Sequence, residues 1–180
     1  MWICKVVKKN AKQNIRFVYM AFELQKAVDY YGYYGPVLLF FITLILLLQN
    51  KLLLMTFVAG FFLNILVNKV AKHCIREPRP SRSFHKFTMD GNEVHIDVSG
   101  MGEEEFGMPS GHAQLVAFTT AFIHLALHNS YITIFYAITS ILTMIERVKY
   151  KNHTVLQVIV GGILGLGLAY GIYQYMFGLF

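Results

Sequence analysis

Residues 106–112, Phe-Gly-Met-Pro-Ser-Gly-His, stand directly before an apolar stretch and have the composition of a helix start. Pro109 suits this place because its missing N–H would have no partner in a first turn, and Ser110 is a preferred N-cap residue. Gly111 allows an anion to approach the free backbone N–H groups. Taken alone, the stretch is also typical of an ordinary capped helix with a histidine, His112, in its first turn.

The composition of the whole chain is that of a membrane protein. Of its 180 residues, 56% are hydrophobic and only 14% are charged, with a net charge of +6. A soluble domain of this length carries about a quarter charged residues. The lysine-rich N-terminus lacks the apolar core of a cleavable signal peptide. Cys4 and Cys74 are too few for a disulfide framework or a zinc site, and we expect them to be free thiols.

Hydropathy predicts an all-α integral membrane bundle of about five transmembrane helices, preceded by an N-terminal amphipathic helix. We expect residues 1–32 to form a basic segment at the membrane surface, since three charged side chains near its end disfavour a crossing, and Gly32 to Pro36 to break it. Residues 33–180 are then a single membrane domain. Its expected spans are residues 36–48, with Tyr33 and Tyr34 as an aromatic edge, 52–71, 110–128, 131–148 and 154–178.

Small and polar residues inside these spans predict how the helices pack. Asn64 and Asn68 lie four residues apart, so they share a helix face that we expect to contact protein rather than lipid. Gly161 and Gly165 have the same spacing in the last span, where small residues permit close helix packing.

The charge distribution places the chemistry on one membrane face. With five crossings, residues 1–32, the polar connection at 72–108 and the turn at 147–153 all lie on the same side. All ten acidic residues and every Lys and Arg except Lys51 are on that side. The connection is too long for a simple turn, so we expect it to carry function, with a short strand or an interfacial loop at residues 94–98.

Two further clusters join the helix start at residues 109–112. Lys72, Arg76 and Arg79 are spaced four and three apart, which predicts one row along a helix that continues from the second span. Alone, this cluster is typical of a basic membrane flank. His153 and Gln157 are four apart at another helix start, so the amide oxygen of Gln157 can accept a hydrogen bond from one imidazole nitrogen and leave the other free as a nucleophile.

Together, two histidines, several cations and a helix N-terminus suit a phosphate or pyrophosphate. One histidine would attack phosphorus while the other protonates the leaving oxygen. No metal is needed if the cations neutralise the phosphoryl oxygens.

The three clusters, in this order, resemble the signature motifs of the type 2 phosphatidic acid phosphatase and haloperoxidase superfamily. Within it, residues 77–80, 106–114 and 153–158 look most like the dolichyldiphosphatases. The resemblance implies that His153 is the nucleophile and forms a phosphohistidine, that His112 is the general acid and that Gln157 orients His153. It also implies a phosphate cradle, formed by Lys72, Arg79, Ser110, Gly111 and Arg147.

Two positions depart from the superfamily pattern. It has an aspartate where Gln157 stands and a serine where Glu146 stands. An amide can orient the imidazole but cannot offset the positive charge that phosphorylation creates, although dolichyldiphosphatase-like members resemble this chain in having it. The Glu146 carboxylate would repel a phosphate beside Arg147 unless it points away or pairs with Lys149 or Lys151.

The resemblance implies a metal-independent and cofactor-free enzyme of the endoplasmic reticulum membrane that hydrolyses a polyprenyl or dolichyl diphosphate to the monophosphate and phosphate. Phosphatidate or another lipid phosphate monoester is the alternative substrate, and a catalytically weak membrane scaffold is the alternative function. The expected partners are the lipid substrate and the bilayer, with no nucleic acid. Charge alone predicts a cytosolic site, whereas the dolichyldiphosphatase resemblance implies a lumenal one. The remaining histidines are expected at the surface or the interface: His73, His85, His95, His124 and His128.

Overall fold

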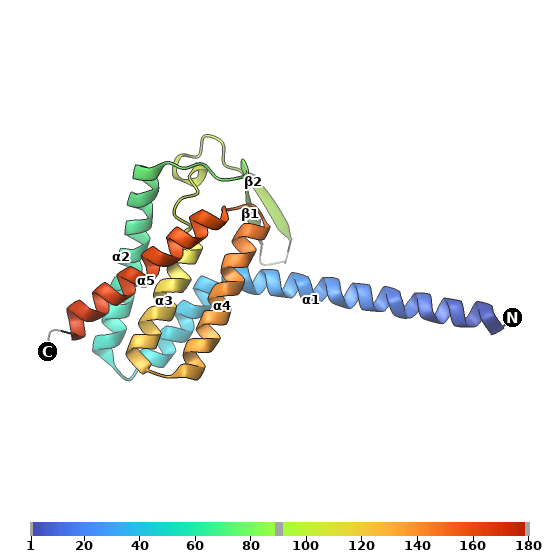
Figure 1. Ribbon diagram of the computed structural model, residues 1–180, viewed down its shortest axis with the longest axis horizontal. Coiled ribbons are helices and arrows are strands. Elements are labelled where there is room, and N and C mark those ends of the chain that lie inside the picture. The colour runs from blue at the N-terminus through green and yellow to red at the C-terminus, as the bar shows by residue number, and fades with distance from the viewer. Residues whose placement is uncertain (1, 89–91, 179–180) are drawn as a thin grey trace.

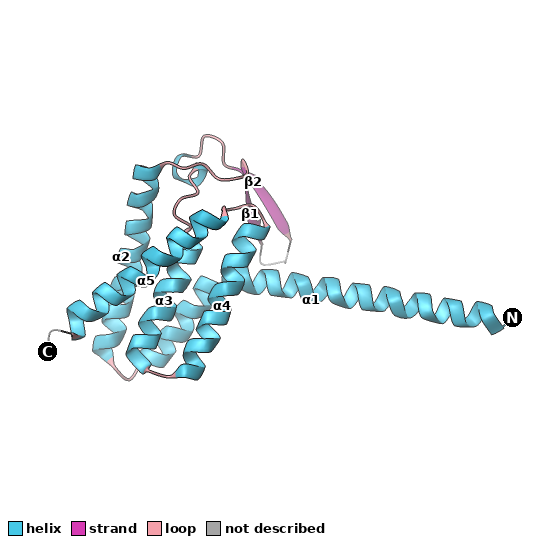
Figure 2. Ribbon diagram, in the orientation of Figure 1, coloured by secondary structure: helices cyan, strands magenta, loops and turns pink. Residues whose placement is uncertain are grey.

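Helices dominate the structure (Figures 1 and 2). The computed structural model describes residues 2–88 and 92–178, with side chains from residue 20 onward in these ranges. Across the described residues the elements are α1 (Trp2–Leu47), α2 (Lys51–Ile75), β1 (Ser83–Phe87), β2 (Glu93–Asp97), the 3₁₀ helix η1 (Gly102–Glu105), α3 (Gly111–Leu127), α4 (Ser130–Lys149) and α5 (Val155–Phe177).

The helices have the length and surface of membrane spans. Four segments are long and apolar enough to cross a bilayer, namely Met20–Leu47 of α1 and the whole of α2, α4 and α5, while α3 is a shorter apolar helix. Large hydrophobic side chains are exposed along these helices, such as Phe41, Phe62 and Ile163. Such a surface is stable in lipid and not in water. The prediction of an all-α, multi-pass membrane bundle is confirmed.

Helix α3 is the centre of the bundle and packs against α1, α2, α4 and α5. Its Phe118 and Phe122 are fully buried and contact the ring of Phe57 from α2. Leu39 of α1 and Tyr136 of α4 complete this core. The short helix is therefore held by all its neighbours, and its first turn has a fixed position.

Small residues on α5 bring it close to α3, as predicted. A Cβ atom at Gly165 would lie 2.2 Å from the carbonyl oxygen of Gln114, and one at Gly161 would lie 2.5 Å from that of Ser110. Both oxygens belong to the α3 backbone or its N-cap, so only glycine allows this approach. The start of α3 therefore rests directly on the first turns of α5.

The two asparagines of α2 face protein, which confirms their predicted orientation. Asn68 donates to the side-chain oxygen of Gln114 at 2.7 Å and to the carbonyl of Pro109 at 3.3 Å. Gln114 in turn donates to the side-chain oxygen of Asn64 at 2.6 Å. These amides, of which Asn64 and Gln114 are buried and Asn68 is half-buried, connect α2 to the start of α3.

Helix α1 runs through residues 32–36, so the predicted break there is wrong. Pro36 lies inside the helix, and prolines are tolerated in membrane helices where neighbouring helices support the backbone. The glycines serve helix packing instead: a Cβ at Gly35 would lie 2.0 Å from the hydroxyl oxygen of Thr143 on α4. The span of α1 is consequently longer than the predicted residues 36–48, and its N-terminal part projects from the bundle (Figure 1).

Of the two alternatives left open for residues 94–98, a short strand or an interfacial loop, the structure has a strand, β2 at Glu93–Asp97. Strand β2 pairs with β1 in an antiparallel register that places His85 opposite His95 and Phe87 opposite Glu93. Phe87 is buried beside the rings of Tyr30 and Tyr33 from α1. The hairpin is thus anchored against the middle of α1, beside the C-terminal end of α4 (Figure 2).

Candidate active site

The segments around Arg79, Ser110 and His153 are far apart in the sequence. They meet at one end of the bundle, where α2 and α4 end and α3 and α5 begin (Figure 1). The N–H of Ser110 donates to the carbonyl of Gln157 at 3.0 Å, and the N–H of His153 donates to the carbonyl of Arg147 at 3.1 Å. The Arg79 guanidinium lies 3.2 Å from the Nε2 atom of His153. The predicted convergence of the three clusters is confirmed.

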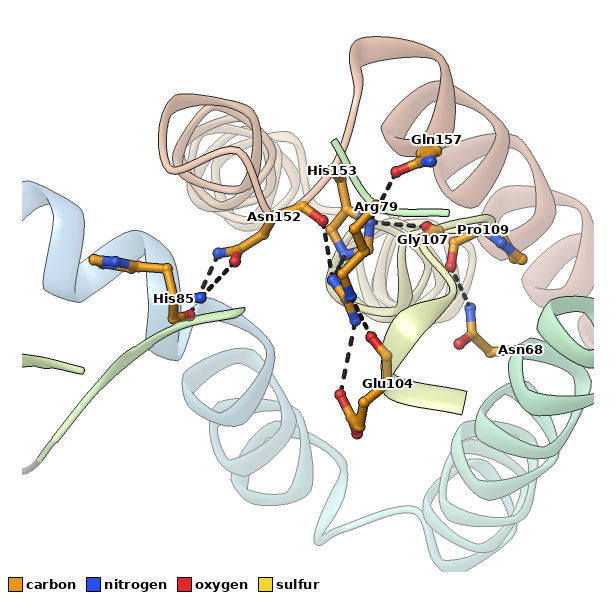
Figure 3. Close-up of polar contacts among 9 residues, drawn as sticks. All are labelled: Asn68, Arg79, His85, Glu104, Gly107, Pro109, Asn152, His153 and Gln157. Carbon is orange, nitrogen blue, oxygen red and sulfur yellow. Dashed lines mark hydrogen bonds and ion pairs between the residues drawn. The ribbon is translucent and has the colours of Figure 1, made fainter. Parts of the chain in front are cut away.

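The imidazole of His153 is buried and held in one orientation (Figure 3). Its Nδ1 atom lies 2.8 Å from the carbonyl oxygen of Gly107. Because a carbonyl only accepts, Nδ1 carries the proton and the lone pair is on Nε2. The expected contact with the side-chain oxygen of Gln157 is present at 3.3 Å. The shorter bond to Gly107 was missed, and its only signal was a glycine before the Pro-Ser-Gly-His stretch.

Gln157 does more than contact the imidazole. Its side-chain oxygen accepts from the N–H of Thr154 at 3.1 Å in a capping box at the start of α5. Its Nε2 atom donates to the Glu77 carboxylate at 2.8 Å and to the carbonyl of Pro78 at 3.0 Å. An aspartate, as in the superfamily pattern, would place a second negative charge beside Glu77. The amide is therefore the side chain that this environment accommodates.

Arg79 reaches the site from a loop, so the predicted helical row of three cations is wrong. Helix α2 ends at Ile75, and Arg76 adopts a left-handed C-cap conformation with φ of 52°. The two prolines that follow cannot continue a helix. The Arg79 guanidinium donates to the carbonyls of Glu104 at 2.6 Å and Asn152 at 2.9 Å, which fixes it against the histidine (Figure 3).

Arg147 is fully buried and paired with its neighbour. The Glu146 carboxylate accepts from both Nε and Nη2 of Arg147, so it pairs with this arginine and not with either nearby lysine; Lys149 instead pairs with Asp29. The remaining Nη1 atom has no hydrogen-bond partner among the described residues. The guanidinium lies over the ring of Tyr33, 4.6 Å from its centroid. The arginine therefore keeps one unused donor.

His112 lies on the first turn of α3 and is half-buried. Its ring is 5.6 Å from the ring of Tyr33, the same ring that Arg147 covers, and it lies within electrostatic reach of His153. Tyr33 was expected at a membrane edge and instead contacts the site. The neighbouring Ser110 hydroxyl is buried without a hydrogen-bond partner in the described part of the chain. Buried donors of this kind are costly unless a ligand pairs with them.

Burial and nearby cations set the protonation state of His153. Lys72 is half-buried at the end of α2 and lines a cavity of about 180 Å³ between α2 and α3. Burial, with the positive charges of Arg79, Lys72 and Arg147, lowers the pKa of His153 well below its usual value. The imidazole is therefore neutral at neutral pH, with an unprotonated Nε2 that accepts from the Arg79 guanidinium.

One of the remaining histidines is not where the sequence predicted. His85 is only 1% exposed, because the hairpin folds its ring onto Tyr150 at 3.9 Å and 8° between planes. The expectation of a solvated surface is wrong for this residue. His73 and His95 are exposed, as expected, and His124 and His128 lie at the far end of α3.

Two solved structures are similar to this one. A PAP2-type phosphatidylglycerolphosphate phosphatase from Bacillus subtilis aligns with a TM-score of 0.58 and 23% identity over 85% of this chain and 75% of its own. LpxE from Aquifex aeolicus aligns with a TM-score of 0.62 and 21% identity over 84% and 87%. At these identities the likeness establishes the fold.

The sequence comparisons agree with the fold. Dolichyldiphosphatase 1 from Rhinolophus ferrumequinum is 28% identical over 141 residues, which cover 69% of this chain and 53% of the relative. The chain thus spans about half the length of this curated relative. Residues 51–180, from the start of α2 to the last residue, match the profile of the PAP2 superfamily. Since this match includes all three gathered motifs and most of the chain, the protein is a multi-pass membrane member of the PAP2 superfamily.

Proposed function

We propose that the protein is a membrane-embedded lipid phosphatase that hydrolyses a polyprenyl or dolichyl diphosphate to the monophosphate and phosphate. The observation that carries this proposal is the setting of His153. Its Nδ1 is bonded to the Gly107 carbonyl, and its Nε2 lone pair faces a guanidinium. A neutral, oriented imidazole beside cations is what attack on a phosphoryl group requires.

In the first step, Nε2 of His153 attacks the terminal phosphorus and the bond from phosphorus to the bridging oxygen breaks. His112 donates a proton to that oxygen as the lipid monophosphate leaves. The phosphoryl group remains on Nε2 as a phosphohistidine. The Gly107 carbonyl, which accepts from Nδ1, stabilises the positive charge that develops on the ring.

In the second step, water attacks the phosphohistidine and the N–P bond breaks. His112, neutral after the first step, accepts the proton from the water. Phosphate leaves, and both histidines return to their starting states. The two half-reactions thus use the same pair of side chains in opposite directions.

The phosphate cradle consists of this chain's own donors. We propose that Arg79, Lys72, the Ser110 hydroxyl, the Gly111 N–H and the unpaired Nη1 of Arg147 bind the phosphoryl oxygens. The two groups without partners, Ser110 Oγ and Arg147 Nη1, support this role. Positive charge and backbone donors of this kind stabilise phosphoryl transfer by positioning and electrostatics, so we propose that catalysis requires no metal and no cofactor.

The substrate class follows from position and from the sequence relative. The site is at the end of an apolar bundle, where a diphosphate head group lies at the interface while its tail stays in the bilayer. The similar dolichyldiphosphatase 1 supports a polyisoprenoid tail, and with it an endoplasmic reticulum membrane. No nucleic acid takes part.

A lipid phosphate monoester is the second candidate substrate. The similar fold of a phosphatidylglycerolphosphate phosphatase, whose name indicates a monoester substrate, favours it. Both candidates use the same transfer to His153 and differ only in the leaving group, which is a phosphate oxygen in one case and an alkoxide oxygen in the other.

Phosphate release by the purified full-length protein in detergent micelles tests the proposal. The substrates are a polyprenyl diphosphate, the matching monophosphate and phosphatidate, without added magnesium. We expect the diphosphate to be cleaved fastest, with inhibition by vanadate, and His153→Ala to be inactive while His73→Ala keeps wild-type activity. Preference for phosphatidate would select the second candidate. Full activity of His153→Ala would refute His153 as the nucleophile. No release from any lipid phosphate would refute the enzyme and leave a membrane scaffold.

A further inference from the structure

The β-hairpin presents three potential metal ligands on one face. His85 and His95 are directly opposite each other, and Glu93 lies two residues before His95 on the same strand. Side chains two apart on a strand, and those of a cross-strand pair, project from the same face of the sheet. The ligand atoms of these three residues all lie within 4.8 Å of one another.

His85 is the unusual member of this set. It is 1% exposed, yet neither Nδ1 nor Nε2 has a hydrogen-bond partner among the described residues. A buried imidazole normally satisfies at least one nitrogen, and an unsatisfied polar group is destabilising. Its ring is fixed between the Tyr150 face, at 3.9 Å, and the edge of Phe87, at 4.8 Å. The ring is therefore held in one orientation although neither nitrogen has a polar partner in the described part of the chain, as expected of a metal ligand.

We propose that His85, Glu93 and His95 bind a divalent transition-metal ion, with Zn²⁺ as the best match. Two imidazoles and one carboxylate form a donor set that suits zinc in a four-coordinate site with one open position.

The geometry allows the ion to be held after a small adjustment. Zinc bound tetrahedrally at about 2.0–2.1 Å needs ligand atoms about 3.3 Å apart. His85 is fixed, whereas Glu93 and His95 are exposed and can rotate toward it. The rings of His85 and His95 are already 5.1 Å apart at their centroids. The ion would thus join the two strands on the side that faces Tyr150.

The proposed ion is separate from the phosphatase chemistry but adjacent to it. The backbone N–H of His85 donates to the Asn152 side chain at 2.8 Å, and Asn152 precedes His153 (Figure 3). An ion that fixes the hairpin would therefore also fix the turn that carries this histidine. Sequence spacing gave no sign of the site, because the two histidines are ten residues apart and only the strand register brings them together.

Zinc binding to the untagged, full-length protein in detergent tests the proposal. After treatment with a chelator and its removal, Zn²⁺ is titrated in competition with a chromophoric chelator, and Co²⁺ absorption reports the coordination. The variants are His95→Ala and Glu93→Gln, both exposed, so that folding is preserved. His128→Ala is the matched control, since His128 forms the other close histidine pair, with His124 at 6.5 Å between centroids.

We expect one tight Zn²⁺ per chain, a rise in Tm on its addition, and tetrahedral Co²⁺ bands. His95→Ala and Glu93→Gln should each weaken binding at least about tenfold and lose the rise in Tm, whereas His128→Ala should retain both. Binding of wild-type strength in His95→Ala, or no Zn²⁺ bound by the wild type at micromolar concentration, would overturn the proposal.

Discussion

The two histidines of the site have very different surroundings. His153 is tied by Nδ1 to a carbonyl, by Nε2 to Arg79 and by its backbone N–H to Arg147. The His112 ring contacts the ring of Tyr33 and has no hydrogen bond among the described residues. A nucleophile must be held in one orientation toward phosphorus. A proton donor must contact the leaving oxygen in the first step and the attacking water in the second. The contrast between a fixed and an unconstrained imidazole therefore supports the proposed division of roles.

Removing each imidazole gives the largest expected effect and separates the two roles. We expect His153→Ala to lower kcat at least about 10⁴-fold on every substrate, because no other group forms the covalent intermediate. We expect His112→Ala to lower kcat about 10²- to 10³-fold on a lipid diphosphate, the range of general acid catalysis. Initial rates of phosphate release on purified variants measure both.

An aryl phosphate with an acidic phenol sharpens this test, because its leaving group departs without a proton. On that substrate the loss for His112→Ala in the initial burst of phenol should shrink to about tenfold, because only the later hydrolysis of the phosphohistidine still needs His112, while the loss for His153→Ala stays complete. Equal recovery of both variants would mean that the fixed imidazole is not the nucleophile.

The pH profile tests why the fixed histidine is reactive. Attack requires neutral His153, and burial and neighbouring cations lower its pKa, so wild-type activity should persist well below pH 6.5. Arg79→Gln removes the nearest of these charges. The pKa of His153 should then rise, and the acidic loss of activity should begin at a higher pH, together with a drop in kcat/KM of about 10²-fold.

Arg82→Gln is the matched control for this experiment, because Arg82 is exposed on the same connection. Its pH profile should overlay that of the wild type. An unchanged acidic limb in Arg79→Gln would show that the arginine does not set the protonation of the imidazole.

The Glu146–Arg147 pair lies on the His112 side of the site, where Arg147 and His112 both contact Tyr33. The Glu146 carboxylate accepts from two of the three guanidinium nitrogens of Arg147. Glu146→Gln should release this cation, so vanadate inhibition should become about tenfold tighter, the size of one charge-assisted hydrogen bond. The same change leaves a buried charge without its partner and should lower stability by about 3–5 kcal/mol. Glu105→Gln, an exposed carboxylate near the site, should alter neither quantity. Weaker vanadate binding by Glu146→Gln would contradict the inference that Glu146 competes with the anion for the Arg147 guanidinium.

Patterns set by local chemistry were predictable from the sequence. The hydropathy of the apolar stretches predicted the spans, and the order of the motifs around Lys72, Ser110 and His153 predicted the segments that meet at one end of the bundle. The four-residue spacing of His153 and Gln157 also predicted the contact from the Gln157 side chain to the imidazole. Each of these predictions depends on residues that are neighbours within one helix or on the number of times the chain crosses the membrane.

Features that depend on tertiary contacts were not predictable. The Gly107 carbonyl carries no side-chain signal, and Tyr33 reads equally well as an interfacial aromatic. The glycines near Pro36 suggested a break, because their role is visible only when Thr143 of α4 lies against Gly35. His85 became buried through the register of a hairpin that spacing did not specify.

The smallest expected effect on activity concerns the packing of α3 against α5, the two helices that begin beside His112 and His153. Gly165→Ala would place a methyl group 2.2 Å from the carbonyl oxygen of Gln114 and 2.9 Å from the amide nitrogen of Phe118. Both are backbone atoms of α3, so α3 and α5 must separate, and overpacking of this kind costs about 1–3 kcal/mol. Gly171→Ala adds the same methyl on the same helix with nothing within 4 Å, and should be neutral or slightly stabilising because alanine favours helix. We expect Gly165→Ala to lower Tm by several degrees and activity a few-fold, measured by thermal unfolding in detergent and by phosphate release. If the two variants unfold at the same temperature, close contact of α3 with α5 is not what holds the start of α3, with His112, against the start of α5.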